Sequence, residues 1–245
     1  MGTPFYKYKK ESKEEKPLSS IEEYEQLNKK LILKYVLDRL CACILLAIAS
    51  PIILFGSFII KLQGWFYPEE AGSIFYTEPR ISAGKVFRII KFRTITEKAV
   101  VQIREKQETK SITGSLGITR AGKFILNWYL DELPQLFNIA KGDMSFVGPR
   151  PHIVAQHNQE IKVGLLYRNV IKAGLLGIPQ ACKRRPKYAS LLKKMERTHK
   201  PYSRALNTLD GLYAKKCMRK KPIEILFFDI SIIFQGLVVV SRGTK

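Results

Sequence analysis

The sequence has few residues of the kinds that build metal cages or covalent crosslinks. Its 245 residues include only four cysteines and three histidines, and no two cysteines form a CxxC pair. Zinc cages and disulfide frameworks require such residues at close, repeated spacings. The sequence therefore predicts buried, reduced thiols, and it assigns no catalytic role to a histidine.

Acidic residues are scarce relative to basic ones. Lysine and arginine number 42 against 21 aspartates and glutamates, which gives a formal net charge of +21. Such an excess indicates an anionic partner, which could be a nucleic acid, a phosphorylated metabolite or a membrane surface. Residues 183–221 hold 14 of the basic residues and only two acidic ones. Because no nucleic-acid-binding motif occurs, we expect this stretch to bind anionic lipid headgroups, the alternative being a solvated basic face.

Charged residues are absent from one long segment, residues 40–60. A helix of this length reaches about 30 Å, the thickness of a hydrocarbon layer. Ser50 and Pro51 stand at its midpoint, where proline bends a helix, and basic residues flank both ends. Since basic flanks stay on the cytoplasmic side, the pattern predicts a re-entrant helix that kinks there and leaves by the same face. A kinked transmembrane helix is the alternative, and no cleaved signal peptide is expected.

Other segments predict the elements around this helix. Ser20 and Glu23 form a capping box, which predicts a helix that starts near Ser20 and runs towards the apolar segment. Residues 223–240 predict an amphipathic helix that lies in the membrane interface or packs on the core. Residues 86–94 are typical of a strand, whereas residues 97–123, with several glycines, predict a mobile loop.

The predicted strand carries two cations in alternate positions. Its period of two places Lys91 and Arg93 on one face. Lysine as a point charge and arginine as a planar fork suit a diphosphate. A solvated basic edge strand is the alternative.

Residues 130–151, LDELPQLFNIAKGDMSFVGPRP, are the most informative part of the chain. Proline is tolerated in a first helical turn and glycine ends helices, so Pro134 and Gly142 predict a short helix that begins near Asp131. Asp131 and Glu132 would then lie at a helix N-terminus, which favours phosphate and a metal-bound carboxylate. The alternative role of Asp131 is a plain N-cap.

Arg150 lies between two prolines in the same block. The flanking Pro149 and Pro151 restrict its backbone, so the guanidinium is presented with little conformational freedom left to lose. This suits phosphate recognition, and a rigid turn is the alternative.

These residues resemble a known family. The KFRT of residues 91–94, the block of residues 130–151 and the helix with a central Ser-Pro closely resemble the bacterial sugar transferases, the monotopic polyprenyl-phosphate phosphoglycosyl transferases. The resemblance extends from about Lys34 to about Val240. It implies a mostly helical α+β protein with a charged tail and helix at residues 1–33, a re-entrant membrane helix at residues 34–62 and a cytoplasmic catalytic domain at residues 63–245.

The resemblance also implies an activity at the cytoplasmic face of a bacterial inner membrane. Members of the family transfer a sugar 1-phosphate from a nucleotide sugar, usually UDP-linked, to a polyprenyl phosphate such as undecaprenyl phosphate, and they require magnesium. The lipid-linked product initiates a glycan such as capsule, exopolysaccharide, O-antigen or a glycoprotein glycan. By resemblance Asp131 is the nucleophile and a magnesium ligand, Glu132 is its partner, and the substrate-binding residues are Lys91, Arg93, Arg150 and Arg184.

Residues 173–185 depart from the family pattern in part. They keep Gln180, but Ala173 replaces a proline and Leu176 replaces a threonine. An inactive relative that acts as a membrane-bound binding or scaffold protein is therefore an alternative function. In a second alternative the two carboxylates only hold magnesium while the lipid phosphate attacks the donor directly. Three further positions that resemble the family, Asp210, Tyr213 and Asp229, are interpreted as structural.

Overall fold

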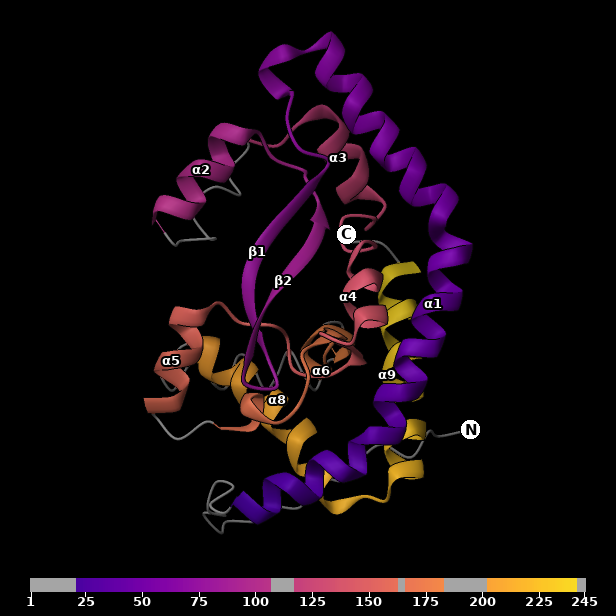
Figure 1. Ribbon diagram of the computed structural model, residues 1–245, viewed down its shortest axis with the longest axis vertical. Coiled ribbons are helices and arrows are strands. Elements are labelled where there is room, and N and C mark those ends of the chain that lie inside the picture. Colours follow the sequence, from indigo (N-terminus) through magenta and orange to yellow (C-terminus); the bar gives the residue numbers. More distant parts are fainter. Residues whose placement is uncertain (1–20, 107–116, 163–165, 183–201, 242–245) are drawn as a thin grey trace.

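The protein is a mostly helical α+β molecule in the computed structural model, which describes residues 21–106, 117–162, 166–182 and 202–241 (Figure 1). Its elements in chain order are α1 (Ile21–Phe66), the 3₁₀ turn η1 (Pro68–Glu70), β1 (Phe75–Ser82), β2 (Lys85–Phe92), α2 (Glu97–Lys106), α3 (Arg120–Asn127), α4 (Gln135–Lys141), β3 (Ser145–Val147), α5 (Val154–Lys162), the 3₁₀ turn η2 (Tyr167–Asn169), β4 (Gly174–Leu176), α6 (Ile178–Cys182), α8 (Tyr202–Arg219) and α9 (Pro222–Ser241).

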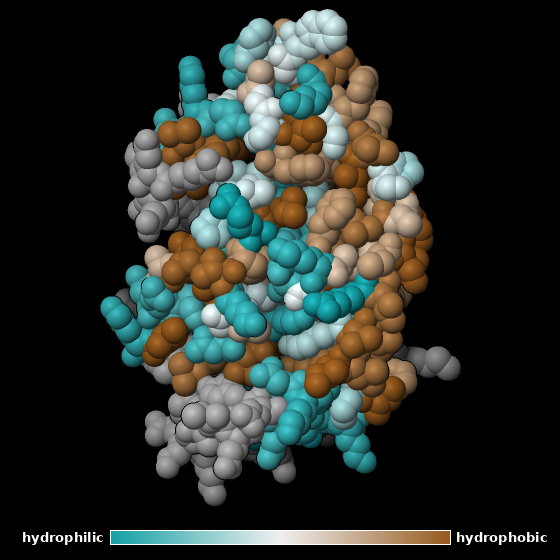
Figure 2. Space-filling view, in the orientation of Figure 1, coloured by the Kyte–Doolittle hydropathy of each residue, from teal (hydrophilic) through white to brown (hydrophobic). Residues whose placement is uncertain are grey.

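The long helix α1 follows one side of the molecule and packs along α3, α4 and α9 (Figure 1). Most of its inward residues recur every three or four positions and are small or apolar, as in Ala49, Ile53 and Ile60, whereas Lys34 and Gln63 are buried polar exceptions. Its outward face is apolar as well, and large side chains such as Ile48 and Leu54 are more than two-thirds exposed. This face forms a hydrophobic band along one edge of the molecule (Figure 2).

Among the described residues, α1 alone is long and apolar enough to cross a membrane, over Gln26–Phe66. Only 22% of the most apolar 18-residue stretch of α1 is buried, which is unlike the core helix of a soluble protein. Pro51 lies inside a helix that is assigned as continuous, and the Ser50 hydroxyl donates a hydrogen bond to the Ala47 carbonyl at 2.8 Å. The predicted kink and re-entrant path therefore stay predictions.

Helix α9 has one face on the core and one face exposed. Ile225 and Ile232 are buried, whereas Phe227, Ile230 and Phe234 are more than 60% exposed. A helix is thus present at the predicted residues and packs on the core, but the expected amphipathic character is wrong. Its outer face is apolar like that of α1.

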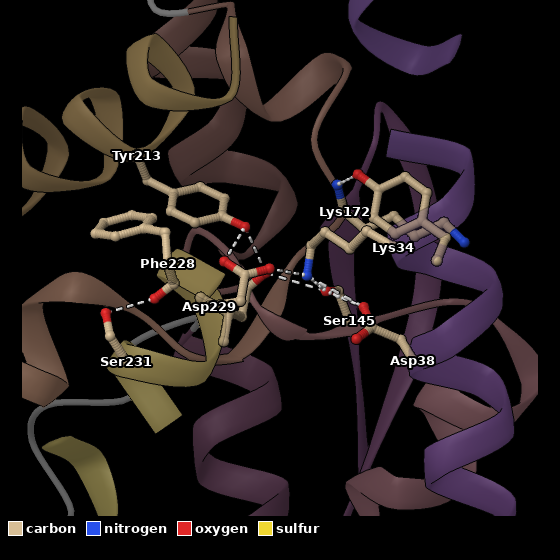
Figure 3. A network of polar contacts seen from close by, with 10 residues as sticks. Lys34, Asp38, Ser145, Lys172, Tyr213, Phe228, Asp229 and Ser231 are labelled. Carbon is tan, nitrogen blue, oxygen red and sulfur yellow. Dashed lines mark hydrogen bonds and ion pairs between the residues drawn. The ribbon is translucent and has the colours of Figure 1, made fainter. Parts of the chain in front are cut away.

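A buried polar cluster joins α1 to α9 and β3; we call it the Lys34 network (Figure 3). Lys34 is 2% exposed, and its ammonium lies 2.7 Å from a carboxylate oxygen of Asp229 and 3.2 Å from one of Asp38. It also donates to the Ser145 hydroxyl at 2.6 Å, and the Tyr213 hydroxyl donates to Asp229 at 2.9 Å. A buried charge needs such partners, so this network fixes the start of the long helix on the rest of the protein.

The expectation of a mobile loop over residues 97–123 is wrong for most of its length. Residues 97–106 form α2 and residues 120–127 form α3, while residues 107–116 lie outside the described part. Helix α3 starts at an N-cap, Thr119, whose hydroxyl accepts a hydrogen bond from the Gly122 amide at 2.9 Å. Ala121 and Ile125 then lie on its buried face, so helical spacing prevailed over the glycine content.

Candidate active site

A β-hairpin of β1 and β2 carries the first site residue. The two strands pair antiparallel with Tyr76 opposite Lys91, and a two-residue turn joins them. Both turn residues, Ala83 and Gly84, have positive φ angles of 46° and 73°. This is the conformation whose twist matches a hairpin, and it fixes the register that places Lys91 near the end of β2. The predicted strand is confirmed, although it spans residues 85–92.

Helix α4 docks on the free edge of β2 through one side chain. The Asn138 carboxamide oxygen accepts from the Ile90 amide at 2.9 Å, and its nitrogen donates to the Arg88 carbonyl at 2.8 Å. The Phe92 amide donates to the Asp131 carbonyl at 3.0 Å. These bonds bring Asp131 beside the end of the strand that carries Lys91.

The helix predicted near Asp131 starts later than expected, at Gln135. Residues 131–134 form successive tight turns instead, with bonds such as the Gln135 amide to the Glu132 carbonyl at 2.9 Å. Pro134 has no amide proton to donate to the Leu130 carbonyl, and the Leu133 amide donates to that carbonyl instead at 3.0 Å, which accounts for the delay. The predicted end is confirmed, because Gly142 has a φ of 90° and caps the helix.

The segment around Arg150 is held on both sides by backbone hydrogen bonds; we call residues 148–152 the arginine strap. The Gly174 amide donates to the Pro149 carbonyl at 2.9 Å, and the Ile81 amide of β1 donates to the His152 carbonyl at 3.0 Å. Gly174 has to be a glycine, because a Cβ there would lie 2.1 Å from the Gly148 nitrogen. The strap thus lies between β1 and the short parallel pair of β3 and β4.

A buried set of charges lies beneath the strap. Arg168 is 3% exposed, and its guanidinium lies 2.7 Å from an oxygen of Asp210 and 3.0 Å from one of Glu160. It also donates a hydrogen bond to the Arg150 carbonyl. The sequence interpretation treated Asp210 as structural, and this position gives it the function of holding Arg168 against the strap.

Lys91, Glu132 and Arg150 meet at one point. The Lys91 ammonium lies 2.8 Å from Glu132 Oε1, and the Arg150 guanidinium lies 3.1 Å from the same oxygen. Among the described residues, no basic side chain lies within ion-pair distance of the Asp131 carboxylate. Glu132 therefore orients the two cations, and the Asp131 carboxylate is left free of the ion pairs that engage Glu132.

The two neighbouring carboxyl groups are held in different electrostatic states. Burial raises the pKa of Asp131, and the charge of Glu132 adds to the rise, although Lys91 and Arg150 oppose it. Burial also acts to raise the pKa of Glu132, but its direct contacts with Lys91 and Arg150 outweigh burial and lower that pKa. Two carboxyl groups with pKa values shifted apart are typical of a site with divided roles.

The structure does not bring Arg93 to this point. Its side chain is 1% exposed, and its guanidinium donates to the carbonyls of Ser73, Ile95 and Glu70 at 2.6–2.9 Å. Strand β2 ends at Phe92, so the alternation that would place Arg93 beside Lys91 stops there. The geometry gives Arg93 a structural position, and Arg184 lies outside the described residues.

A small pocket opens beside Glu132. Its volume is about 40 Å³, and its walls include Arg80, Lys91, Gln135 and Arg150. Sequence reasoning missed Arg80 and Gln135. The available signal for Gln135 was a polar residue directly before the apolar Leu136 and Phe137 of a short helix.

Magnesium fits the donor set of this site. The described residues contain no group of three or more His, Cys, Asp or Glu side chains that could cage a metal ion. Magnesium, however, keeps several waters and is bound by one or two carboxylates together with substrate phosphates. The adjacent carboxylates of Asp131 and Glu132 match that requirement.

Comparison with known proteins decides the family. A family description, bacterial sugar transferase, matches residues 29–243. The chain belongs to the bacterial sugar transferase family. Its match includes the hairpin, the arginine strap and both carboxylates described above.

Curated relatives of this sugar transferase act on undecaprenyl phosphate according to their names. A UDP-N-acetylgalactosamine-undecaprenyl-phosphate N-acetylgalactosaminephosphotransferase of Aeromonas hydrophila is 34% identical over 152 residues, which is 60% of this chain and 33% of the relative. A UDP-glucose:undecaprenyl-phosphate glucose-1-phosphate transferase of Klebsiella pneumoniae is 30% identical over 154 residues, 61% of this chain and 31% of the relative. An undecaprenyl-phosphate galactose phosphotransferase of Salmonella typhimurium is 32% identical over 160 residues, 60% and 32% of the two chains. The chain thus aligns with about a third of each of these relatives.

Proposed function

We propose that this sugar transferase moves a sugar 1-phosphate from a UDP-sugar to undecaprenyl phosphate, at the cytoplasmic face of a bacterial inner membrane, as the first step of a membrane-linked glycan. The names of the relatives support the donor and acceptor classes. The observation that carries the proposal for this chain is the pair of carboxyl groups: Glu132 holds Lys91 and Arg150, and Asp131 has no ion pair with any residue that the structure describes.

The proposed reaction has two displacements at one phosphorus. An oxygen of Asp131 attacks the sugar-proximal phosphorus, forms an oxygen–phosphorus bond and displaces the nucleoside monophosphate. An oxygen of the lipid phosphate then attacks the same phosphorus and displaces Asp131. A carboxylate with a raised pKa is a stronger nucleophile than an ordinary aspartate once it is deprotonated, which suits this role.

The basic residues stabilise the charge of the phosphoryl oxygens. Glu132 holds the ammonium of Lys91 and the guanidinium of Arg150 near one point, so the two groups need little reorganisation when a diphosphate binds. Asp131 and Glu132 are the residues that would hold magnesium, which when bound supplies further positive charge at those oxygens.

The position of α1 supports the meeting of a soluble donor with a lipid acceptor. Helix α1 packs directly along α4, the helix that follows Asp131 and Glu132, and its outward face is an apolar band (Figure 2). We propose that this band enters the membrane as a re-entrant helix that bends near Ser50 and Pro51. The site then lies at the membrane surface.

Cysteine accessibility in intact cells tests the topology. Cys41 and Cys43 are exposed on α1, so the prediction of buried thiols is wrong for these two. Both are first replaced by serine, after which Lys29 or Glu69 is changed to cysteine. Both positions are exposed and lie on opposite sides of the apolar segment. We expect neither to react with an impermeant reagent until the membrane is opened. Reaction of only one of them in intact cells would show that the helix crosses the membrane.

Turnover assays test the reaction. Purified protein with undecaprenyl phosphate, magnesium and a panel of UDP-sugars should release uridine monophosphate with at least one donor. Asp131→Asn should reduce this release at least about 1,000-fold, because it removes a covalent nucleophile. Asp143→Asn is the matched control, since Asp143 pairs with Lys141 at the far end of α4 at 3.3 Å. Equal effects of the two substitutions would contradict the role of Asp131.

A further inference from the structure

Gln135, the first residue of α4, is buried with its side-chain amide unpaired. The residue is 2% exposed, and its amide nitrogen has no hydrogen-bond partner among the described residues. A buried amide without a partner costs free energy that an apolar side chain of the same size would avoid. We therefore expect a ligand to accept a hydrogen bond from this amide in the ligand-bound protein.

Asn138, one turn further along α4, shows what a structural amide looks like in this helix. It is equally buried, at 2% exposed, but both ends of its carboxamide are bonded to the backbone of β2. Its two bonds dock the helix on the strand. The amide nitrogen of Gln135 makes no such bond within the described part of the chain, so docking of the helix does not explain its presence.

The Gln135 side chain lines the pocket beside Glu132, together with three cationic side chains. Lys91 and Arg150 lie on Glu132, as described above, and Arg80 pairs with Glu78 at 2.6 Å while donating to the Pro151 carbonyl at 3.4 Å. The excess of positive charge selects an anion. A volume of about 40 Å³ admits a small group such as a phosphoryl group, and it is too small for a nucleoside.

We propose that Gln135 is a phosphate-binding residue, whose amide donates a hydrogen bond to a phosphoryl oxygen held in this pocket by Lys91 and Arg150. The inference deepens the proposed function and rests on it. A donor diphosphate and the phosphate of the lipid acceptor share this chemistry, and both are tested below. Gln135 supplies a neutral donor to a pocket whose walls already include three cationic side chains.

Two substitutions at Gln135 separate binding from folding. Gln135→Met keeps the length of the side chain and removes the amide, and Gln135→Glu keeps the shape but adds a negative charge. A hydrogen bond to a charged group is strong enough that Gln135→Met should weaken phosphate binding about 10- to 100-fold. Gln135→Glu should weaken it more. The melting temperature of the ligand-free Gln135→Met protein should stay unchanged or rise, because no bond of the free protein is lost.

Asn138→Leu is the matched control. It removes two hydrogen bonds of the free protein, so it should lower the melting temperature of ligand-free protein. If Gln135→Met lowers the melting temperature as much as Asn138→Leu does, Gln135 is structural and the proposal is wrong.

The assay is the thermal stabilisation of full-length protein in detergent by three probes: a UDP-sugar, undecaprenyl phosphate and inorganic phosphate. A loss of affinity on Gln135→Met for the UDP-sugar alone would place the donor phosphate in the pocket, and a loss for undecaprenyl phosphate alone would place the acceptor phosphate there. Wild-type affinity of Gln135→Met for every probe that stabilises the wild type would overturn the proposal, as would a wild type that no probe stabilises. Lack of turnover by the wild type with every donor would refute the proposed function, whereas the inorganic phosphate probe would still decide the role of Gln135.

Discussion

Removal of the Lys34 ammonium should destabilise the protein strongly. Lys34→Met replaces a buried cation with an apolar side chain of similar length and leaves the carboxylates of Asp229 and Asp38 without their shared partner. Breaking a buried ion pair from one side typically costs about 3–5 kcal/mol. Asp38 is 12% exposed at its side chain and can regain some water, so we expect the lower end, about 3 kcal/mol.

The loss should be visible in thermal unfolding. For a protein of this size each kcal/mol corresponds to roughly 2–4 °C, so the melting temperature of Lys34→Met in detergent should fall by about 6–12 °C. Lys29→Met is the control, because Lys29 is exposed on the same helix and should change stability by less than about 0.5 kcal/mol. Circular dichroism at 222 nm, a helix signal, measures both.

A double-mutant cycle tests the reason for the loss. Asp229→Asn in the Lys34→Met background removes one of the stranded charges and leaves an amide that still accepts from the Tyr213 hydroxyl. The combined loss should therefore be smaller than the sum of the two single losses. Additive losses, or a fall of less than about 1 kcal/mol for Lys34→Met alone, would refute the argument that the network is held together by its buried charge.

Two more predictions follow from buried groups near the site. Arg93→Lys should lower the free energy of unfolding by roughly 2–4 kcal/mol, and with it the melting temperature, because one ammonium cannot reach three carbonyls. The folded fraction of this variant should keep the wild-type KM for the UDP-sugar. A raised KM at unchanged stability would instead make Arg93 a substrate ligand. Burial lowers the pKa of His152, against the opposing effect of Glu160 at 2.7 Å, so the folded protein binds a proton less readily than the unfolded chain. The stability that neutral His152 contributes is present above about pH 6.5 and is lost as the pH falls towards the lowered pKa. The melting temperature of His152→Gln, measured between pH 7.5 and 5.5, should therefore depend less on pH than that of the wild type.

The sequence predicts those elements whose signals are local. The strand that carries Lys91 and the end of α4 at Gly142 follow from residue types and spacing, and both are confirmed. The helix α3 was missed because its glycine suggested a loop, although Gly122 in fact donates to the cap at Thr119. In the same way, the start of α4 depended on the amide proton that Pro134 lacks.

The candidate site was only partly predictable for a physical reason. Each predicted site residue has a signal in the single sequence: two prolines flank Arg150, strand alternation singles out Lys91, and Asp131 and Glu132 shortly precede Pro134 at a predicted helix start. Contacts between segments that are far apart in the chain leave no such local signal. The sequence around Arg93 looks like the sequence around Lys91, so it does not distinguish the two residues. The difference lies in the three carbonyl partners of Arg93, which come from segments before and after the hairpin.

The direct test of the account is a single-turnover experiment without the lipid acceptor. Full-length protein is mixed with its UDP-sugar and magnesium, and the release of uridine monophosphate and the mass of the intact protein are followed after rapid quenching. We expect about one monophosphate per active site and then no more, with a phosphosugar adduct on the peptide that contains Asp131 and none in Asp131→Asn. Neither burst nor adduct, in a preparation that is fully active once undecaprenyl phosphate is added, would contradict the covalent route and leave direct attack by the lipid phosphate in its place.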